Sequence, residues 1–189
     1  EARVEVVSNI HSLVRDTPGF DARRDLVFVG GFRHLPNVDA VQWLAREILP
    51  RLRARQPELV LHVVGGAVPA QVQALAGTPG LRLHGQLDAL EPLLDACRVS
   101  VAPLRYGAGV KGKVNQAMAR GLPVVATRCA AEGMHLVEGE DVLLADDADG
   151  FADAVLRVYA DPALWQRLRE GGYANTQRWF SPEAARATL

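Results

Sequence analysis

The sequence predicts an α/β domain in which helices cover both faces of a parallel sheet. Short, continuous apolar runs alternate with helical patterns along the chain, and glycines often follow the runs. Strands that are buried on both faces give uninterrupted apolar runs, as in a Rossmann-like, doubly wound sheet. The chain has 189 residues, of which 49% are hydrophobic and 23% charged, so it can bury one sizeable core.

The elements follow from these runs in chain order. About six strands are expected, at 26–29, 59–64, 81–84, 99–102, 123–126 and 141–145. Helices are expected at 37–52, 69–76, 90–96, 114–120, 150–159 and from 161 onward. Asn37 is expected to cap the first helix, Asp161-Pro162 to start the last, and Gly171-Gly172 to interrupt it.

Composition excludes several classes of protein. The formal net charge is −1, so no global field attracts nucleic acid, and any phosphate site must be local. No apolar run is long enough to span a bilayer. Cys97 and Cys129 form no disulfide framework or metal motif, which favours a reducing, cytoplasmic compartment. The histidines show no metal spacing, and we expect His62 and His84, within strands, to be structural.

The lysine turn, residues 106–113, is the most informative motif. It contains both lysines of the chain, Lys111 and Lys113, together with Gly107 and Gly109. The turn leads into a helix whose start carries partial positive charge, so cations there are unfavourable unless an anion is also bound. A nucleotide phosphate is the obvious anion. The alternative is a solvated loop with two surface lysines.

The glycine loop, residues 30–34, is a second candidate. Gly30 and Gly31 directly follow the first strand, where ligands of open parallel sheets bind. Glycines there allow a ligand to approach the backbone closely. Arg33 and His34 could reach phosphate oxygens, although a plain strand-to-helix connection would contain the same residues.

Two further polar residues could bind hydroxyl groups. Gln116 lies three residues after Lys113 on the same helix face, and its amide can bond two hydroxyls. Glu132 stands in a loop after the fifth strand. The alternatives are a solvated glutamine and a free surface acid.

Together these motifs resemble the carboxyl-terminal, donor-binding domain of GT-B glycosyltransferases, most nearly family 4, the group 1 glycosyl transferases. The run from Gly107 to Thr127 is the specific part of the resemblance. Other segments that carry it are Phe28-Val-Gly-Gly-Phe32, Pro36–Val41, Leu61–Gly65, Leu83-His-Gly85, Val101–Leu104 and Glu132-Gly133.

The resemblance implies retaining transfer of a sugar from a nucleoside diphosphate, in polysaccharide or lipopolysaccharide assembly, without a metal or other cofactor. Lys111 and Lys113 would be the catalytic cations that stabilise the departing phosphate. The donor-binding residues would be Gly30, Gly31, Arg33, Gly85, Arg105, Gly107, Gly109, Val110, Gln116 and Glu132.

The sequence departs from the family pattern at two pairs of positions. The common Glu-x7-Glu pair is replaced by Ala108 and Gln116, so a bond to the ribose would lack charge assistance. Gly31 and Asn37 occupy the places of an arginine and a lysine that often follow the first strand. We expect other basic residues to substitute for these, namely Lys111 and Lys113 first, then Arg33 and Arg105.

Two alternatives to a transferase therefore stay open. One is a non-catalytic module that binds a nucleotide or sugar on the same fold. The other is an enzyme similar to a nucleotide-sugar epimerase.

The expected domain organisation places a linker and edge segment at 1–20, the nucleotide-sugar-binding domain at 21–180, and the start of a carboxyl-terminal tail at 181–189. The chain begins without methionine, and we expect it to be a piece of a longer polypeptide. A glycan or lipid-linked acceptor would then bind through a missing amino-terminal domain. The full-length protein would be cytoplasmic, with peripheral contact at the inner face of a membrane as a further expectation.

Overall fold

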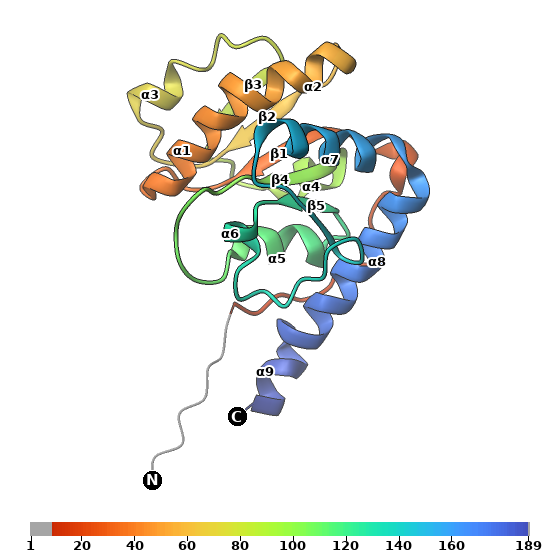
Figure 1. Cartoon of the computed structure of the whole chain (residues 1–189). Coiled ribbons are helices and arrows are strands. Elements are labelled where there is room, and N and C mark those ends of the chain that lie inside the picture. The colour runs from red at the N-terminus through yellow and green to blue at the C-terminus, as the bar shows by residue number, and fades with distance from the viewer. Residues whose placement is uncertain (1–8, 189) are drawn as a thin grey trace.

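The computed structural model describes residues 9–188 and contains a six-stranded parallel sheet in the order β3-β2-β1-β4-β5-β6 (Figure 1). The strands are β1 (Arg24–Val29), β2 (Leu61–Val64), β3 (Leu81–Gly85), β4 (Cys97–Ala102), β5 (Val124–Ala126) and β6 (Val142–Leu144). Each overlaps a strand expected from the sequence, which confirms the doubly wound, Rossmann-like fold. The order reverses between β1 and β4, so the topological switch point lies between these two strands.

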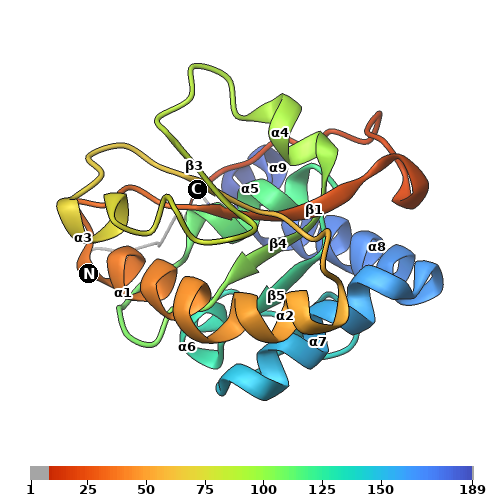
Figure 2. The same ribbon diagram turned by 90° about the horizontal axis from the view of Figure 1, so that it is seen from above.

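Helices cover both faces of the sheet. They are α1 (Leu35–Trp43), α2 (Leu49–Arg55), α3 (Ala70–Gln73), α4 (Glu91–Ala96), α5 (Gly112–Ala119), α6 (Arg128–Ala131), α7 (Ala148–Ala160), α8 (Pro162–Trp179) and α9 (Pro182–Thr188). Figure 2 shows α1, α2 and α7 on one side of the sheet and α4, α5 and α8 on the other. Among the described residues, none of these helices has the length and hydropathy to cross a membrane.

The first helix begins earlier than the sequence indicated, and the cap predicted at Asn37 is wrong. His34 precedes the first helical residue without a side-chain cap, and Pro36 lies in the first turn. Proline suits that position because its missing N–H would have no partner within the helix. A π-helical segment, Leu44–Ile48, joins α1 to α2. The Asn37 amide lies inside the first turn and bonds to groups outside the helix, described below.

The interruption predicted at Gly171-Gly172 is also wrong, because α8 runs through both glycines. A Cβ on Gly171 would lie 2.2 Å from the carbonyl oxygen of Glu140, and one on Gly172 would lie 3.1 Å from Cγ of Met118. The two glycines therefore let the helix pack closely against the loop before β6 and against α5. This tertiary packing offsets their low helix propensity.

The segment that enters the domain runs along α5 and α8. Val14 donates its N–H to the Ala119 carbonyl at 2.8 Å, and the Tyr173 hydroxyl donates to the Val14 carbonyl at 2.8 Å. Residues 1–8 of the predicted linker lie outside the described residues. The described part of the segment is thus tied to the helix that starts at the lysine turn.

A buried carboxyl before β6 gives a pH-dependent prediction. Asp141 is 6% exposed and accepts the Val137 N–H at 2.8 Å, and its pKa is raised to about 6, chiefly by burial. Because this pKa is above that in the unfolded chain, the folded state binds more protons between about pH 4 and 6. The contribution of Asp141 to stability is therefore complete at low pH and lost as pH rises through about 6.

We expect Asp141→Asn to gain stability relative to the unchanged chain as pH rises through this interval, since asparagine keeps an acceptor for Val137 and does not titrate. Urea unfolding of both proteins from pH 4 to 8 measures the difference. A difference that is constant across this pH range would contradict the shifted pKa.

Candidate functional site

The glycine loop and the lysine turn meet at the switch point. They follow β1 and β4, which are neighbours in the sheet, and the carboxyl ends of both strands lie at the same edge. A Cβ on Gly107 would lie 3.4 Å from Cγ of Pro36, so the turn packs against the start of α1. The structure therefore brings the two motifs together, as expected for the ends of adjacent parallel strands.

Lys113 joins the two motifs directly. Its ammonium donates a hydrogen bond to Oδ1 of Asn37, and the Asn37 amide N–H donates to the Gly31 carbonyl at 2.8 Å. The ammonium also lies over the ring of Phe28 in β1, with 4.5 Å between Nζ and the ring centroid. Lys113 thus reaches from α5 to the end of β1 and the first turn of α1.

The charge on Lys113 has no carboxylate partner within residues 9–188. Burial, together with the positive charge of Lys111, lowers its pKa to about 7. Burying an ammonium without a counter-ion is costly. A bound anion would remove that cost, so this position is suited to receive one.

Lys111 takes a different position. It precedes the first residue of α5, is half-buried, and donates to the carbonyls of Gly107 and Gly109 within its own turn. Those glycines have φ values of 122° and 82°, which glycine adopts readily. No side chain caps α5, and the Val114 N–H in its first turn donates to the Lys111 carbonyl at 2.8 Å, so only the N–H groups before Val114 are open to a ligand.

The glycines at the carboxyl ends of β1, β2 and β3 pack closely together. A Cβ on Gly65 would lie 2.0 Å from the Gly30 carbonyl oxygen, and the Gly65 N–H donates to the Gly85 carbonyl at 2.8 Å. Gly85 has a φ of 70° and ends β3, two strands from β1. Gly30 and Gly31 therefore lie beside the lysine turn, whereas Gly85 lies further along the same edge.

The two arginines predicted to bind the donor lie in different environments. Arg105 forms a bidentate ion pair with Asp39 of α1 and lies over the Trp43 ring, 5.4 Å from its centroid. Its guanidinium therefore already has an anionic partner. Arg33 is exposed and makes no ion pair or side-chain hydrogen bond within the described part of the chain, so it is available to a ligand. Binding of the donor by either arginine stays a prediction.

The remaining candidates surround the turn without contacting its ammonium groups. Gln116 is half-buried in α5, and its amide has no hydrogen-bond partner among residues 9–188. Glu132 is exposed at the end of α6. A Cβ on the next residue, Gly133, would lie 3.9 Å from Val110 of the turn. The loop that carries Glu132 therefore borders the lysine turn.

Comparison with known proteins identifies the family. The family model described as "Glycosyl transferases group 1" matches residues 23–161. The chain belongs to the group 1 glycosyl transferases. The recognition made from the sequence is thus confirmed, and the match includes both the glycine loop and the lysine turn.

One curated relative and two solved structures agree with this assignment. The lipopolysaccharide core biosynthesis glycosyltransferase LpsE of Rhizobium meliloti (strain 1021) is 33% identical over 138 residues, which are 69% of this chain and 40% of the relative. A mutant of TarM from S. aureus, solved with Fondaparinux, alpha-GlcNAc-glycerol and UDP, superposes with a TM-score of 0.77 at 15% identity and covers 96% of this chain and 37% of TarM.

The second solved structure is the C-terminal domain of LpcC from Francisella tularensis, a glycosyl transferase group 1 family protein. It superposes with a TM-score of 0.66 at 14% identity, over 94% of this chain and 99% of that domain. At such identities the two structures show the fold alone. The chain spans only 40% of the length of LpsE and 37% of TarM.

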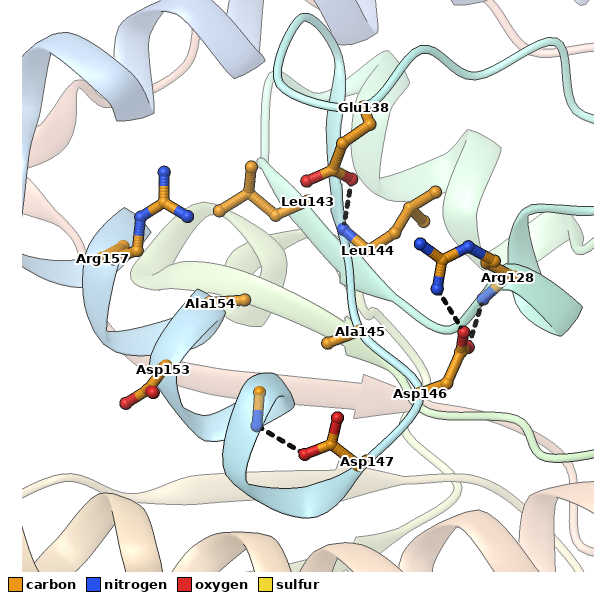
Figure 3. Close-up of a pocket in the computed structure, with 11 residues that line it drawn as sticks. Arg128, Glu138, Leu143, Leu144, Ala145, Asp146, Asp147, Asp153, Ala154 and Arg157 are labelled. Carbon is orange, nitrogen blue, oxygen red and sulfur yellow. Dashed lines mark hydrogen bonds and ion pairs between the residues drawn. The ribbon is translucent and has the colours of Figure 1, made fainter.

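This group 1 glycosyl transferase has an open pocket of about 390 Å³ next to β6 (Figure 3). None of the predicted site residues lines it. Its carboxylates mainly bond to neighbouring groups. Asp146 accepts from the backbone and guanidinium of Arg128, Asp147 caps α7 through the Gly150 N–H, and Glu138 accepts a backbone N–H of β6. These bonds hold the end of β6 and the start of α7 in place.

The two histidines that were expected to be structural lie in β2 and β3, at the end of the strand order away from β6. Nδ1 of His62 lies 2.8 Å from Nε2 of His84, and Nε2 of His62 lies 3.7 Å from Asp25. Cys97 and Cys129 are both free thiols. Within residues 9–188, no group of three or more histidine, cysteine or acidic side chains could hold a metal ion.

Proposed function

We propose that this group 1 glycosyl transferase chain binds the nucleoside diphosphate of a sugar donor at the switch point. The observation that carries the proposal is Lys113, an ammonium that is buried against Phe28 and lacks a carboxylate partner in the described residues. The site lies where open parallel sheets bind their ligands. The UDP in the TarM complex indicates that a protein of similar fold binds a nucleoside diphosphate.

The chemistry follows from the groups that surround this position. Sugar transfer releases a nucleoside diphosphate, so negative charge grows on the departing phosphate oxygens. Lys113, Lys111 and the open N–H groups at the start of α5 would stabilise that charge in a partly desolvated site. Arg33, which is exposed in the glycine loop, would also stabilise this charge. Binding and orientation, rather than a protein nucleophile, would provide the rest of the rate.

The reaction type and the biosynthetic role that we propose concern the full-length protein. We propose a retaining hexosyltransferase of lipopolysaccharide or polysaccharide assembly, a role supported by the name of the relative LpsE. The acceptor would bind through parts of the protein outside this chain, so we expect the chain alone to transfer no sugar. We also propose cytoplasmic action without a required metal. Transfer by the full-length protein that is unchanged in EDTA would support metal independence.

A non-catalytic donor-binding module is the second candidate. Ala108 and Gln116 replace the glutamate pair that is common in the family, and this replacement favours the module. An assay of the full-length protein with nucleotide sugars separates the two candidates. Sugar transfer or slow donor hydrolysis supports an enzyme, whereas donor binding without either supports the module.

We expect the double variant Lys111→Ala, Lys113→Ala to bind nucleoside diphosphates about a hundred-fold more weakly than the unchanged chain. Hydrogen bonds from charged groups contribute about 1.5–3 kcal/mol each, and every 1.4 kcal/mol is a factor of ten in affinity. Calorimetric titration with UDP, GDP and ADP measures the change. Arg46→Ala, Arg82→Ala removes the same net charge away from the switch point and serves as the control. Equal affinities in the two double variants would contradict this site.

A further inference from the structure

Asn37 lies at the centre of the contacts that place the Lys113 ammonium. The residue is 7% exposed although it belongs to the first turn of a helix. Its Oδ1 accepts from Lys113, and its amide N–H donates to the Gly31 carbonyl at 2.8 Å. Both neighbours require the same amide orientation, because a flipped amide would place two donors against each other at Lys113 and two acceptors at Gly31.

Gly30 provides the space for this arrangement. A Cβ at Gly30 would lie 2.7 Å from Cγ of Asn37 and 2.9 Å from both amide heavy atoms. The absence of a side chain at Gly30 therefore allows the Asn37 amide to pack on the backbone of the glycine loop. The same packing restricts the amide to a narrow range of positions.

The ammonium retains bonding capacity after these contacts. A lysine ammonium has three N–H donors. One donates to Asn37, and the Phe28 ring covers one side of the group at 4.5 Å from Nζ to the ring centroid. The charge on Lys111 repels it, and no carboxylate within residues 9–188 neutralises it. Asn37 thus orients the cation and leaves its positive charge unneutralised. An aspartate at this position would neutralise that charge.

We propose that Asn37 is a positioning residue that holds the Lys113 ammonium at the start of α1, so that α5 supplies the cation that meets the donor diphosphate there. This inference rests on the proposed function. It assigns a role to the residue that occupies the place of a basic side chain in the family pattern. The cation then comes from the neighbouring helix, and Asn37 is its neutral acceptor.

A double-mutant cycle tests whether Asn37 acts through Lys113. We expect Asn37→Ala to weaken UDP binding about ten-fold, the size expected for a misplaced charge-assisted hydrogen bond. In the background of Lys113→Ala, the same substitution should have no further effect. Additive losses would overturn the proposal, because they would mean that Asn37 contributes independently of the lysine.

Direct titration of Lys113 provides a readout that does not depend on a ligand. The chain has only two lysines, so carbon-13 NMR of the side-chain ε-methylenes gives two signals, which Lys111→Ala assigns. We expect Asn37→Ala to lower the pKa of Lys113, because an acceptor for the charged form is lost, and Asn37→Asp to raise it. A Lys113 pKa that is unchanged in both variants would overturn the contact on which the proposal depends.

An exchange of the two side chains covers the case in which Asn37→Ala unfolds. In the double variant Asn37→Lys, Lys113→Asn, the ammonium comes from α1 and the amide from α5, and the two groups again face each other. We expect this variant to bind UDP at least ten-fold more tightly than Lys113→Asn alone. Failure of the exchange to restore binding would count against the positioning role.

The outcomes separate the two proposals. No binding of UDP, GDP or ADP by the unchanged chain would overturn both the donor site and the positioning role. Binding that Lys113→Ala weakens and Asn37→Ala leaves unchanged would overturn the positioning role alone. Unfolding curves in urea for each variant distinguish lost binding from lost structure.

Discussion

Gly65→Ala is expected to destabilise the chain by about 3 kcal/mol and to abolish binding of nucleoside diphosphates. A Cβ at this position would lie 2.0 Å from the Gly30 carbonyl oxygen and 2.8 Å from its carbon. Both are backbone atoms at the end of a central strand, where the Gly30 N–H is bonded to the Val64 carbonyl at 2.9 Å. Relief of the clash must therefore move the glycine loop and with it the contact between Asn37 and Lys113.

The control is Gly31→Ala, in the same loop. A Cβ at Gly31 meets no atom within 4 Å, and Gly31 is not among the glycines with a positive φ. We expect this variant to keep the stability of the unchanged chain. Urea unfolding measures both variants, and a loss of stability in Gly65→Ala no larger than that in Gly31→Ala would refute the packing argument.

Arg23→Leu is expected to cost about 4 kcal/mol of stability. The Arg23 side chain is fully buried, and its guanidinium donates to carbonyl oxygens of four residues in separate segments, Pro18, Leu94, Cys97 and Arg120. Burial lowers its pKa to about 10, so the group stays charged at neutral pH. Leucine would leave these carbonyls without their donors in the interior, and each such loss is costly.

An exposed arginine provides the comparison for this prediction. Arg15 is 61% exposed, and its guanidinium lies 3.8 Å from Glu170. Surface ion pairs of this kind contribute at most about 1 kcal/mol, so Arg15→Leu should be nearly neutral. Thermal unfolding measured by circular dichroism compares the two. Similar melting temperatures for both variants would show that the buried hydrogen bonds of Arg23 add little.

The strands were predictable from the sequence for a local reason, and so was the meeting of the glycine loop and the lysine turn at one edge of the sheet. Buried parallel strands require continuous apolar runs, and all six runs became strands. Lys111 and Lys113 were identified because both lysines fall in one glycine-rich turn. The carboxyl edge followed from the general geometry of such sheets, without knowledge of any particular contact.

The errors arose where a residue has its main partner far away in the chain. Asn37 before an apolar stripe has the features of a helix cap, yet its amide bonds to Lys113, 76 residues later. Gly171-Gly172 has the features of a helix end, yet the pair packs on Glu140 and Met118. The pairing of Arg105 with Asp39, 66 residues earlier, was likewise not visible in the sequence, although binding of the donor by Arg105 stays a prediction. Local patterns do not distinguish these tertiary roles.

The sequence by itself determined the α/β class, the strand segments and, by resemblance, the family, whereas the role of the lysine turn stays a prediction. Apolar periodicity and glycine placement act over short stretches of chain and predict the class and the strands, whereas the family came from the resemblance of residues 107–127 and other segments to known members. Only the tertiary structure decided which candidate cations lack a counter-ion within residues 9–188 and which of them is also buried, because pairing and desolvation depend on side chains that folding brings together. It left Lys113 partly buried beside Asn37 and paired Arg105 with Asp39.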